Sequence, residues 1–215
     1  MTVNYPIIEQ SDEKILEIVQ QLQVAYKLKR TLRYSTKRDM NEHSESVAEH
    51  VFALWFLAQY FLPLEDPKRQ LNVEKLFQIL LFHDFAEVVH GDIPYHQKTE
   101  VDEKHERAAA KIVFESLPAP LGETAYKRWK EFEQKQSPES RFAQALDKIE
   151  PIFEMLDPVN SQSMKRLKFS YKDHIGKKTR ATEGFPVMRK FLEVVTKEML
   201  RRDIFWKDVH VLHQV

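Results

Sequence analysis

Four polar side chains that lie far apart in the sequence could bind one metal ion together: His50, the adjacent pair His83 and Asp84, and Asp147. Taken singly, His50 or Asp147 would be an ordinary core or surface residue. The pair is different, because it follows the apolar run 79–82, where a buried imidazole and carboxylate are costly unless a cation pairs them. Adjacent helical residues reach one point only near a helix end, so the pair is expected there.

This set supplies two imidazole nitrogens and two carboxylates, which suits one divalent ion. The residue types leave Mn, Co, Ni, Zn, Fe and Mg open. An ion with a free coordination position can lower the pKa of a bound water and polarise a phosphoryl oxygen. The chain has no cysteine, which excludes disulfides and cysteine-bound zinc.

The elements that must position these residues are all predicted to be helices, because apolar residues recur at helical spacing and the chain contains only four glycines. The expected helices cover about 12–25, 46–62 (with Ser44 as an alternative start), 73–89, 103–117, 121–136, 137–157 and 185–200. Pro63 is expected to end the second helix and Pro151 to kink the sixth. The polar stretch 159–184 is predicted to be a long loop or lid, and the tail after 200 to dock on the core.

Composition narrows the class of protein further. Lys and Arg number 33, as do Asp and Glu, so the formal net charge is zero and binding to nucleic acid is not favoured. The first 20 residues lack a signal pattern, and we find no apolar run of the ~18 residues typical of a membrane span. We therefore expect an all-α, single-domain, cytoplasmic protein of 215 residues that does not bind membranes.

The order of the ligands, H…HD…D, resembles the HD superfamily of metal-dependent phosphohydrolases, and further segments resemble its 5′-deoxynucleotidase (YfbR-like) branch. The matching segments are Leu28-Lys29-x-x-x-Arg33-Tyr34, Ser46-Val47-Ala48-Glu49-His50, His83-Asp84-x-x-Glu87, Gly91-Asp92-Ile93-Pro94-x-x-x-Lys98 and Asp147-Lys148. A bare HD pair would be weak evidence, whereas five ordered segments are strong. The resemblance implies an HD-domain helical bundle with the metal between central helices, a metal-binding core over about 25–160, and a C-terminal part over 161–215.

The resemblance also implies roles for single residues. His50, His83, Asp84 and Asp147 would be the metal ligands. Glu87 would position or deprotonate the attacking water, with Asp92 as a second catalytic group. Arg33 would bind the phosphate through its guanidinium, Lys98 would offset phosphate charge, and Tyr34 could stack on a base.

The expected activity is release of phosphate from nucleoside or deoxynucleoside 5′-monophosphates by a homodimer. Two other classes stay open at this point. One is an HD-type phosphodiesterase or alarmone hydrolase, although Val88 stands where alarmone hydrolases usually carry an acid. The other is a module that binds a metal or nucleotide without catalysis, which would have no need of Glu87 and Arg33.

Overall fold

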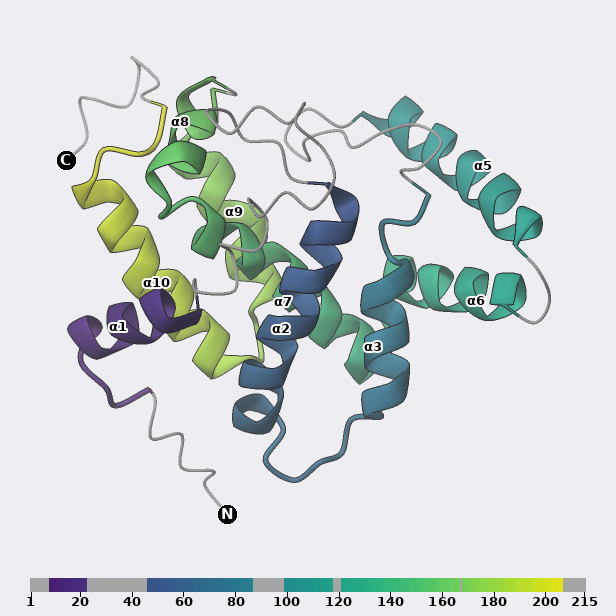
Figure 1. The fold of residues 1–215 in the computed structure, drawn as a ribbon, viewed down its shortest axis with the longest axis horizontal. Helices are drawn as coiled ribbons and strands as arrows, with labels where there is room; N and C mark the ends of the chain where they lie inside the picture. Colours follow the sequence, from purple (N-terminus) through teal and green to yellow (C-terminus); the bar gives the residue numbers. More distant parts are fainter. Residues whose placement is uncertain (1–7, 23–45, 87–98, 118–120, 167, 207–215) are drawn as a thin grey trace, which may run out of the picture.

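The computed structural model describes residues 8–22, 46–86, 99–117, 121–166 and 168–206, and every regular element within these ranges is a helix. In chain order the helices are α1 (Asp12–Leu22), α2 (Val47–Glu65), α3 (Val73–Phe82), α5 (Glu100–Ser116), α6 (Leu121–Gln134), α7 (Pro138–Glu154), α8 (Pro158–Arg166), α9 (Tyr171–Ala181) and α10 (Pro186–Arg201). The predicted all-α fold class is confirmed (Figure 1).

Side-chain caps set several of the helix starts. Ser46 caps α2, where its hydroxyl accepts the N–H of Glu49 and the Glu49 carboxylate accepts the N–H of Ser46. Asn72 caps α3, and Ser137 caps α7 immediately before a proline in the first turn. A proline costs little there, because the first helical N–H groups have no partner within the helix. These starts agree with those expected from the sequence.

Helix α7 is the centre of the fold, since it contacts α2, α3, α6, α9 and α10. One apolar cluster extends from Ile15 on α1 to Phe205 beyond α10 and includes buried residues of α2, α3, α7 and α10. The predicted docking of the tail is confirmed as far as the structure describes it, because Ile204 and Phe205 are buried. The helices that carry the candidate ligands are therefore fixed by the main core.

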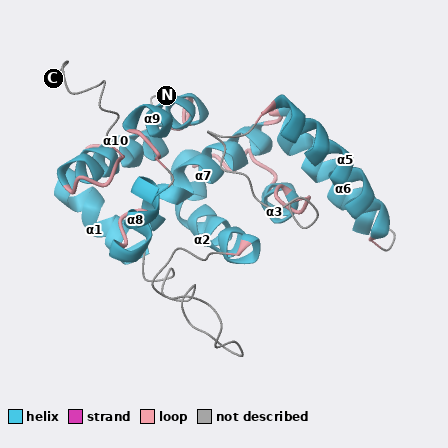
Figure 2. Cartoon of the chain, turned by 90° about the horizontal axis from the view of Figure 1, so that it is seen from above, coloured by secondary structure: helices cyan, strands magenta, loops and turns pink. Residues whose placement is uncertain are grey.

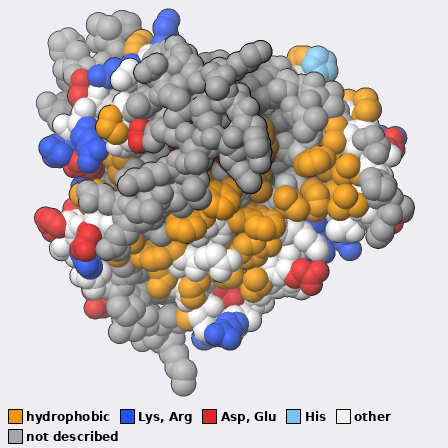
Figure 3. Space-filling model, in the orientation of Figure 1, with side chains coloured by type: hydrophobic (Ala, Val, Ile, Leu, Met, Phe, Trp, Pro, Cys, Tyr) orange, Lys and Arg blue, Asp and Glu red, His pale blue; other side chains and the backbone are white. Residues whose placement is uncertain are grey.

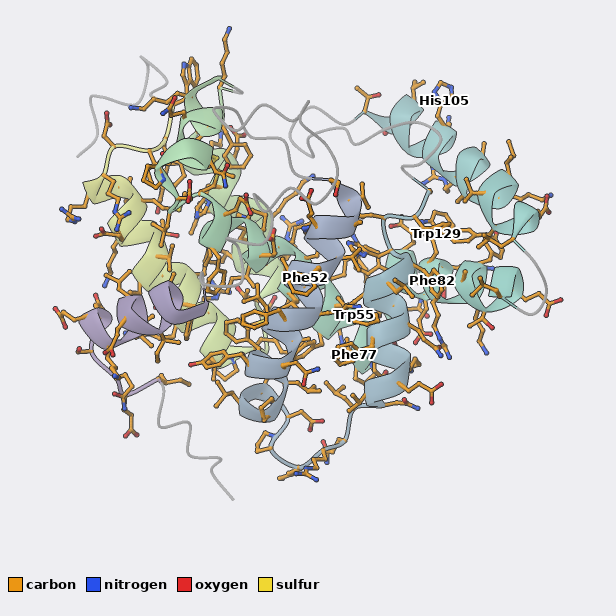
Figure 4. All side chains as sticks on the ribbon, in the orientation of Figure 1. Phe52, Trp55, Phe77, Phe82, His105 and Trp129 are labelled. Atoms are coloured by element: carbon orange, nitrogen blue, oxygen red, sulfur yellow. The ribbon has the colours of Figure 1, made fainter. Side chains whose placement is uncertain are left out.

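A second, smaller cluster holds α5 and α6 beside the end of α3, as the view from above shows (Figure 2). Phe82, Phe114 and Trp129 are its large members, and Figure 4 labels Phe82 and Trp129. Gly122 allows α6 to approach α5 closely, because a Cβ there would lie 2.3 Å from the carbonyl oxygen of Phe114.

Two helix ends differ from the sequence predictions. Helix α2 was expected to end at Pro63 but continues to Glu65, although Pro63 lacks the N–H that would bond to the carbonyl of Gln59. Helix α3 ends at Phe82 rather than near 89, and residues 83–86 form turns. The other helix ends lie within a few residues of the expected positions.

The loop or lid predicted over 159–184 is wrong, because most of this stretch forms α8 and α9. Ser170 and Asp173 form a capping box at the start of α9, so the helix has a strong local start signal. His174 and Lys178 of α9 are buried against the core, which stabilises a helix whose composition is polar. Packing therefore overrides the polar composition of this segment.

Among the described residues, α2 is the one helix long and apolar enough to cross a membrane, which by itself is weak evidence. Its buried face, which includes Leu54, Leu57 and Phe61, belongs to the protein core. On its other face Phe52 and Trp55 are 46% and 38% exposed, and Trp55 meets Phe77 of α3 edge-on at 5.3 Å. Figure 3 shows hydrophobic side chains gathered over this part of the molecule, and Figure 4 labels Phe52, Trp55 and Phe77.

Buried His174 makes the stability of the fold depend on pH. Its Nε2 lies 2.9 Å from the hydroxyl of Thr196, and burial, aided by Lys178, lowers its pKa to about 2. Because the unfolded chain takes up this proton near pH 6.5 and the folded chain does not, the contribution of His174 is present above that pH. As the pH falls, it is lost at about 1.4 kcal/mol per pH unit.

We expect His174→Gln to have a shallower loss of unfolding free energy between pH 6 and pH 4.5, roughly one proton less in slope. Urea unfolding at a series of pH values measures this directly. His105→Gln, which replaces an exposed histidine on α5 (Figure 4), is the matched control. Parallel pH curves for His174→Gln and the wild type would contradict the assignment.

Candidate metal centre

The structure brings the four predicted ligands together. One ligand atom from each of His50, His83, Asp84 and Asp147 can be chosen so that all four atoms lie within 4.8 Å of one another. They come from the start of α2, the end of α3 and the middle of α7, three helices that contact one another. His83 is buried and the other three are partly buried, so the cluster keeps some exposure to solvent.

His50 lies in the part of α2 that the Ser46 cap fixes, and its backbone N–H donates to the carbonyl of Ser46 at 3.0 Å. Its ring faces acids on two sides. Nε2 lies 3.3 Å from Oδ1 of Asp147 and 3.7 Å from Oδ2 of Asp84, whereas Nδ1 lies 3.2 Å from Oε2 of Glu150. Nε2 is therefore the nitrogen that points into the cluster.

His83 and Asp84 converge because α3 ends directly before them. His83 is the C-cap residue, and its Nδ1 lies 2.9 Å from the carbonyl oxygen of Leu80. This contact directs Nε2 toward the cluster, where it lies 3.0 Å from Oδ2 of Asp84. The expectation that the pair would sit near a helix end agrees with this geometry.

Asp147 projects from α7 with its two oxygens engaged differently. Oδ1 faces His50, and Oδ2 accepts from Nζ of Lys148 at 2.6 Å. The lysine therefore occupies one carboxylate oxygen and leaves the other for the cluster. Pro151 lacks the N–H that would bond to the carbonyl of Asp147, and the neighbouring carbonyl of Lys148 accepts from buried Lys178 on α9.

The charges of the cluster favour a cation. Burial opposes ionisation of His50, but Glu150 and Asp147 raise its pKa well above the ordinary value. Burial likewise opposes ionisation of His83, whose pKa Asp84 raises. Burial also opposes ionisation of the two aspartates, but His83 lowers the pKa of Asp84. Lys148 and His50 lower the pKa of Asp147 well below its ordinary value. The carboxylates thus stay ionised and draw positive charge to their side chains.

The residues fit a divalent metal ion. Nε2 of His83 is buried and, although Asp84 is near, has no hydrogen bond of acceptable geometry. A buried nitrogen without a hydrogen-bond partner is costly, and coordination to a cation would satisfy its lone pair. Bonds of about 2.0–2.2 Å place ligand atoms roughly 3–4 Å apart across a metal, which the observed separations approach.

Five other predicted site residues, Arg33, Tyr34, Glu87, Asp92 and Lys98, lie outside the described residues, so their roles stay predictions. Conversely, the sequence reasoning missed Glu150 and Lys178, both buried beside the cluster. The sequence contained a pattern that could have identified Glu150, because it follows Asp147 by three residues and therefore lies on the same helix face. No such pattern pointed to Lys178, since it lies in a polar stretch predicted to be a loop.

Comparisons with known proteins agree with the fold and the cluster. A family model described as HD domain matches residues 25–189. The 5′-deoxynucleotidase HDDC2 of Xenopus laevis is 31% identical over 142 residues, which cover 65% of this chain and 68% of the relative. The 5′-deoxynucleotidase hdd1 of Schizosaccharomyces pombe is 31% identical over 150 residues, 67% of this chain and 73% of the relative.

A solved structure shows the same fold. The crystal structure of a predicted metal-dependent phosphohydrolase from Magnetospirillum magnetotacticum superposes with a TM-score of 0.68. The two chains are 23% identical, and the match covers 88% of this chain and 95% of the other. The arrangement of α2, α3 and α7 around the cluster is thus part of a known architecture.

Proposed function

The chain belongs to the HD domain family of metal-dependent phosphohydrolases, and from that premise we propose that it releases phosphate from nucleoside 5′-monophosphates, including deoxy forms. The observation that carries the proposal is the convergence of two histidines and two aspartates, with His83 Nε2 buried and without a hydrogen bond. Relatives named 5′-deoxynucleotidases support the choice of substrate class.

In this proposal His50, His83, Asp84 and Asp147 hold one divalent ion, which when bound supplies Lewis acidity and lowers the pKa of a bound water. The metal stays open among Mn, Co, Ni, Zn, Fe and Mg, because this ligand set suits all of them. Lys148 holds Oδ2 of Asp147, so that Oδ1 stays directed at the ion. The residue directly before Glu87, Ala86, is buried.

The substrate contacts are proposed from the sequence alone. Glu87 accepts the proton of the attacking water or orients it, and Asp92 assists. Arg33 and Lys98 stabilise the charge that shifts over the phosphoryl oxygens, and Tyr34 stacks on the base. The products are a nucleoside and inorganic phosphate, and no covalent intermediate is required. A homodimer and a cytoplasmic location also stay predictions.

A substrate panel tests the proposed function. Metal-stripped protein is supplied with Mn²⁺, Co²⁺, Ni²⁺, Zn²⁺, Fe²⁺ or Mg²⁺ and tested for phosphate release from ribo- and deoxyribonucleoside 5′-monophosphates. We expect release that depends on the added metal and falls to background in the stripped protein. Nucleoside 3′-monophosphates serve as a matched control, because they carry the same base, sugar and phosphate but with the phosphate on the 3′ oxygen.

The same panel separates the rival activities. Hydrolysis of a cyclic nucleotide or of a guanosine alarmone, with none of a monophosphate, would replace the proposed reaction by a diesterase or pyrophosphohydrolase. A protein that binds metal tightly and hydrolyses none of these compounds would favour a binding module instead.

A further inference from the structure

We propose that Glu150 is a positioning residue of the metal centre, which accepts the Nδ1–H of His50 and thereby directs Nε2 of that ring at the cation. Glu150 lies on α7 three residues after Asp147, and the two side chains reach opposite nitrogens of the same imidazole. This inference rests on the proposed metal site and adds a residue that would not touch the ion.

The geometry around His50 assigns a different task to each ring nitrogen. Nδ1 lies 3.2 Å from Oε2 of Glu150, and Nε2 lies 3.3 Å from Oδ1 of Asp147. A neutral imidazole carries one proton, so donation from Nδ1 to Glu150 leaves the lone pair on Nε2. That is the tautomer a metal ligand needs, and a carboxylate behind the ring also makes the ligating nitrogen more basic.

The other histidine of the cluster shows why His50 needs such a partner. The His83 side chain has no exposed surface, its ring lies 4.8 Å from that of Phe132, and its Nδ1 meets a backbone carbonyl at 2.9 Å. The His50 side chain is 15% exposed, so packing restricts it less. A charged acceptor forms a stronger hydrogen bond than a carbonyl does, and Glu150 therefore supplies the orientation that packing leaves open.

The burial of Glu150 supports a specific role. The residue is 1% exposed in the middle of the fold, where an ionised carboxylate is costly unless charged or polar groups compensate it. His50 offers an N–H at hydrogen-bond distance, and buried Lys178 reaches the carbonyl of Lys148 two residues earlier on the same helix. An apolar residue would fill this position of α7 at lower cost if packing were its only purpose.

The test measures metal affinity rather than hydrolysis. The full chain is stripped of metal, and its affinities for Co²⁺ and Mn²⁺ are determined by competition with a coloured chelator. We expect Glu150→Ala to bind both ions about 10–100-fold more weakly than the wild type. Glu150→Gln, which keeps the shape and an acceptor oxygen but loses the charge, is expected to fall between the two. Glu154→Gln, another buried carboxylate on α7, is the matched control and should bind like the wild type.

The outcomes separate this inference from the metal site itself. Circular dichroism of the metal-free variants establishes whether they are folded. If Glu150→Ala does not fold, the near-isosteric Glu150→Gln still tests the proposal. Folded Glu150 variants with wild-type affinity for both ions would overturn the positioning role while leaving the metal site intact. Equal weakening in Glu154→Gln would also overturn it, because the effect would then belong to any buried carboxylate of α7. A wild type without affinity for either ion would refute the metal site.

Discussion

Replacing Asp84 by asparagine is expected to reduce metal-dependent phosphate release by on the order of a thousandfold or more. Asparagine keeps the size of the side chain but removes the negative charge that faces both histidines. In the structure Oδ2 of Asp84 lies 3.0 Å from Nε2 of His83 and 3.7 Å from Nε2 of His50, so it is central to the cluster. Metal content by atomic emission and phosphate release by a colorimetric assay are measured on the same preparation.

The size of the effect follows from what the ion contributes to the reaction. Charge stabilisation by a metal in the transition state is worth several kcal/mol, and each 1.36 kcal/mol corresponds to a tenfold change in rate. A variant that loses the ion loses this stabilisation together with the acidified water. We therefore expect Asp84→Asn to lose bound metal and activity in parallel, and excess metal to restore part of both.

Glu139→Gln is the matched control for Asp84→Asn. Glu139 is also a buried acid, but it accepts the N–H of Asn72 at 2.9 Å and pairs with Lys75 at 2.7 Å, at the opposite end of α3 from the cluster. Its replacement should lower stability and leave metal content unchanged. Full metal-dependent activity in Asp84→Asn would rule out the cluster as the catalytic centre.

The metal cluster could be predicted from the sequence because its signals are local and ordered. His83 and Asp84 directly follow an apolar run, and the segments around His50 and Asp147 match a family pattern in the same order. What the sequence did not provide is the arrangement of helices that brings α2 and α7 to the end of α3. The contacts between these helices depend on buried apolar residues that many packings could satisfy.

The failure over residues 159–184 has a specific physical cause. The stretch is polar, and its two glycines and several lysines indicate a loop by composition. Yet Ser170 and Asp173 provide a helix start, and the buried side chains of His174 and Lys178 are satisfied by Thr196 and by the carbonyl of Lys148. Partners on other helices cannot be seen in a local pattern, so composition assigns His174 and Lys178 to a solvated segment although both side chains are buried in the core.

Phe61→Ala is expected to cost about 3–5 kcal/mol of unfolding free energy, the range for a buried phenylalanine truncated to alanine. Phe61 has no exposed surface, and its ring meets Phe191 of α10 at 5.1 Å and Phe153 of α7 at 6.2 Å. It therefore joins the helix that carries His50 to the helix that carries Asp147. For a chain of this size the melting temperature should fall by roughly 6–20 °C, measured by scanning calorimetry.

Phe52→Ala on the same helix is the matched control, because Phe52 is 46% exposed and its replacement should change stability by no more than about 0.5 kcal/mol. Metal at a hundredfold excess over its dissociation constant should return about 2.7 kcal/mol to Phe61→Ala, provided that the folded variant binds the ion as the wild type does. Equal losses for the two variants would mean that α2 does not present these faces to core and solvent. A stabilisation by metal that disappears in Phe61→Ala would instead show that the aromatic contacts of Phe61 hold His50 and Asp147 at the spacing the ion requires.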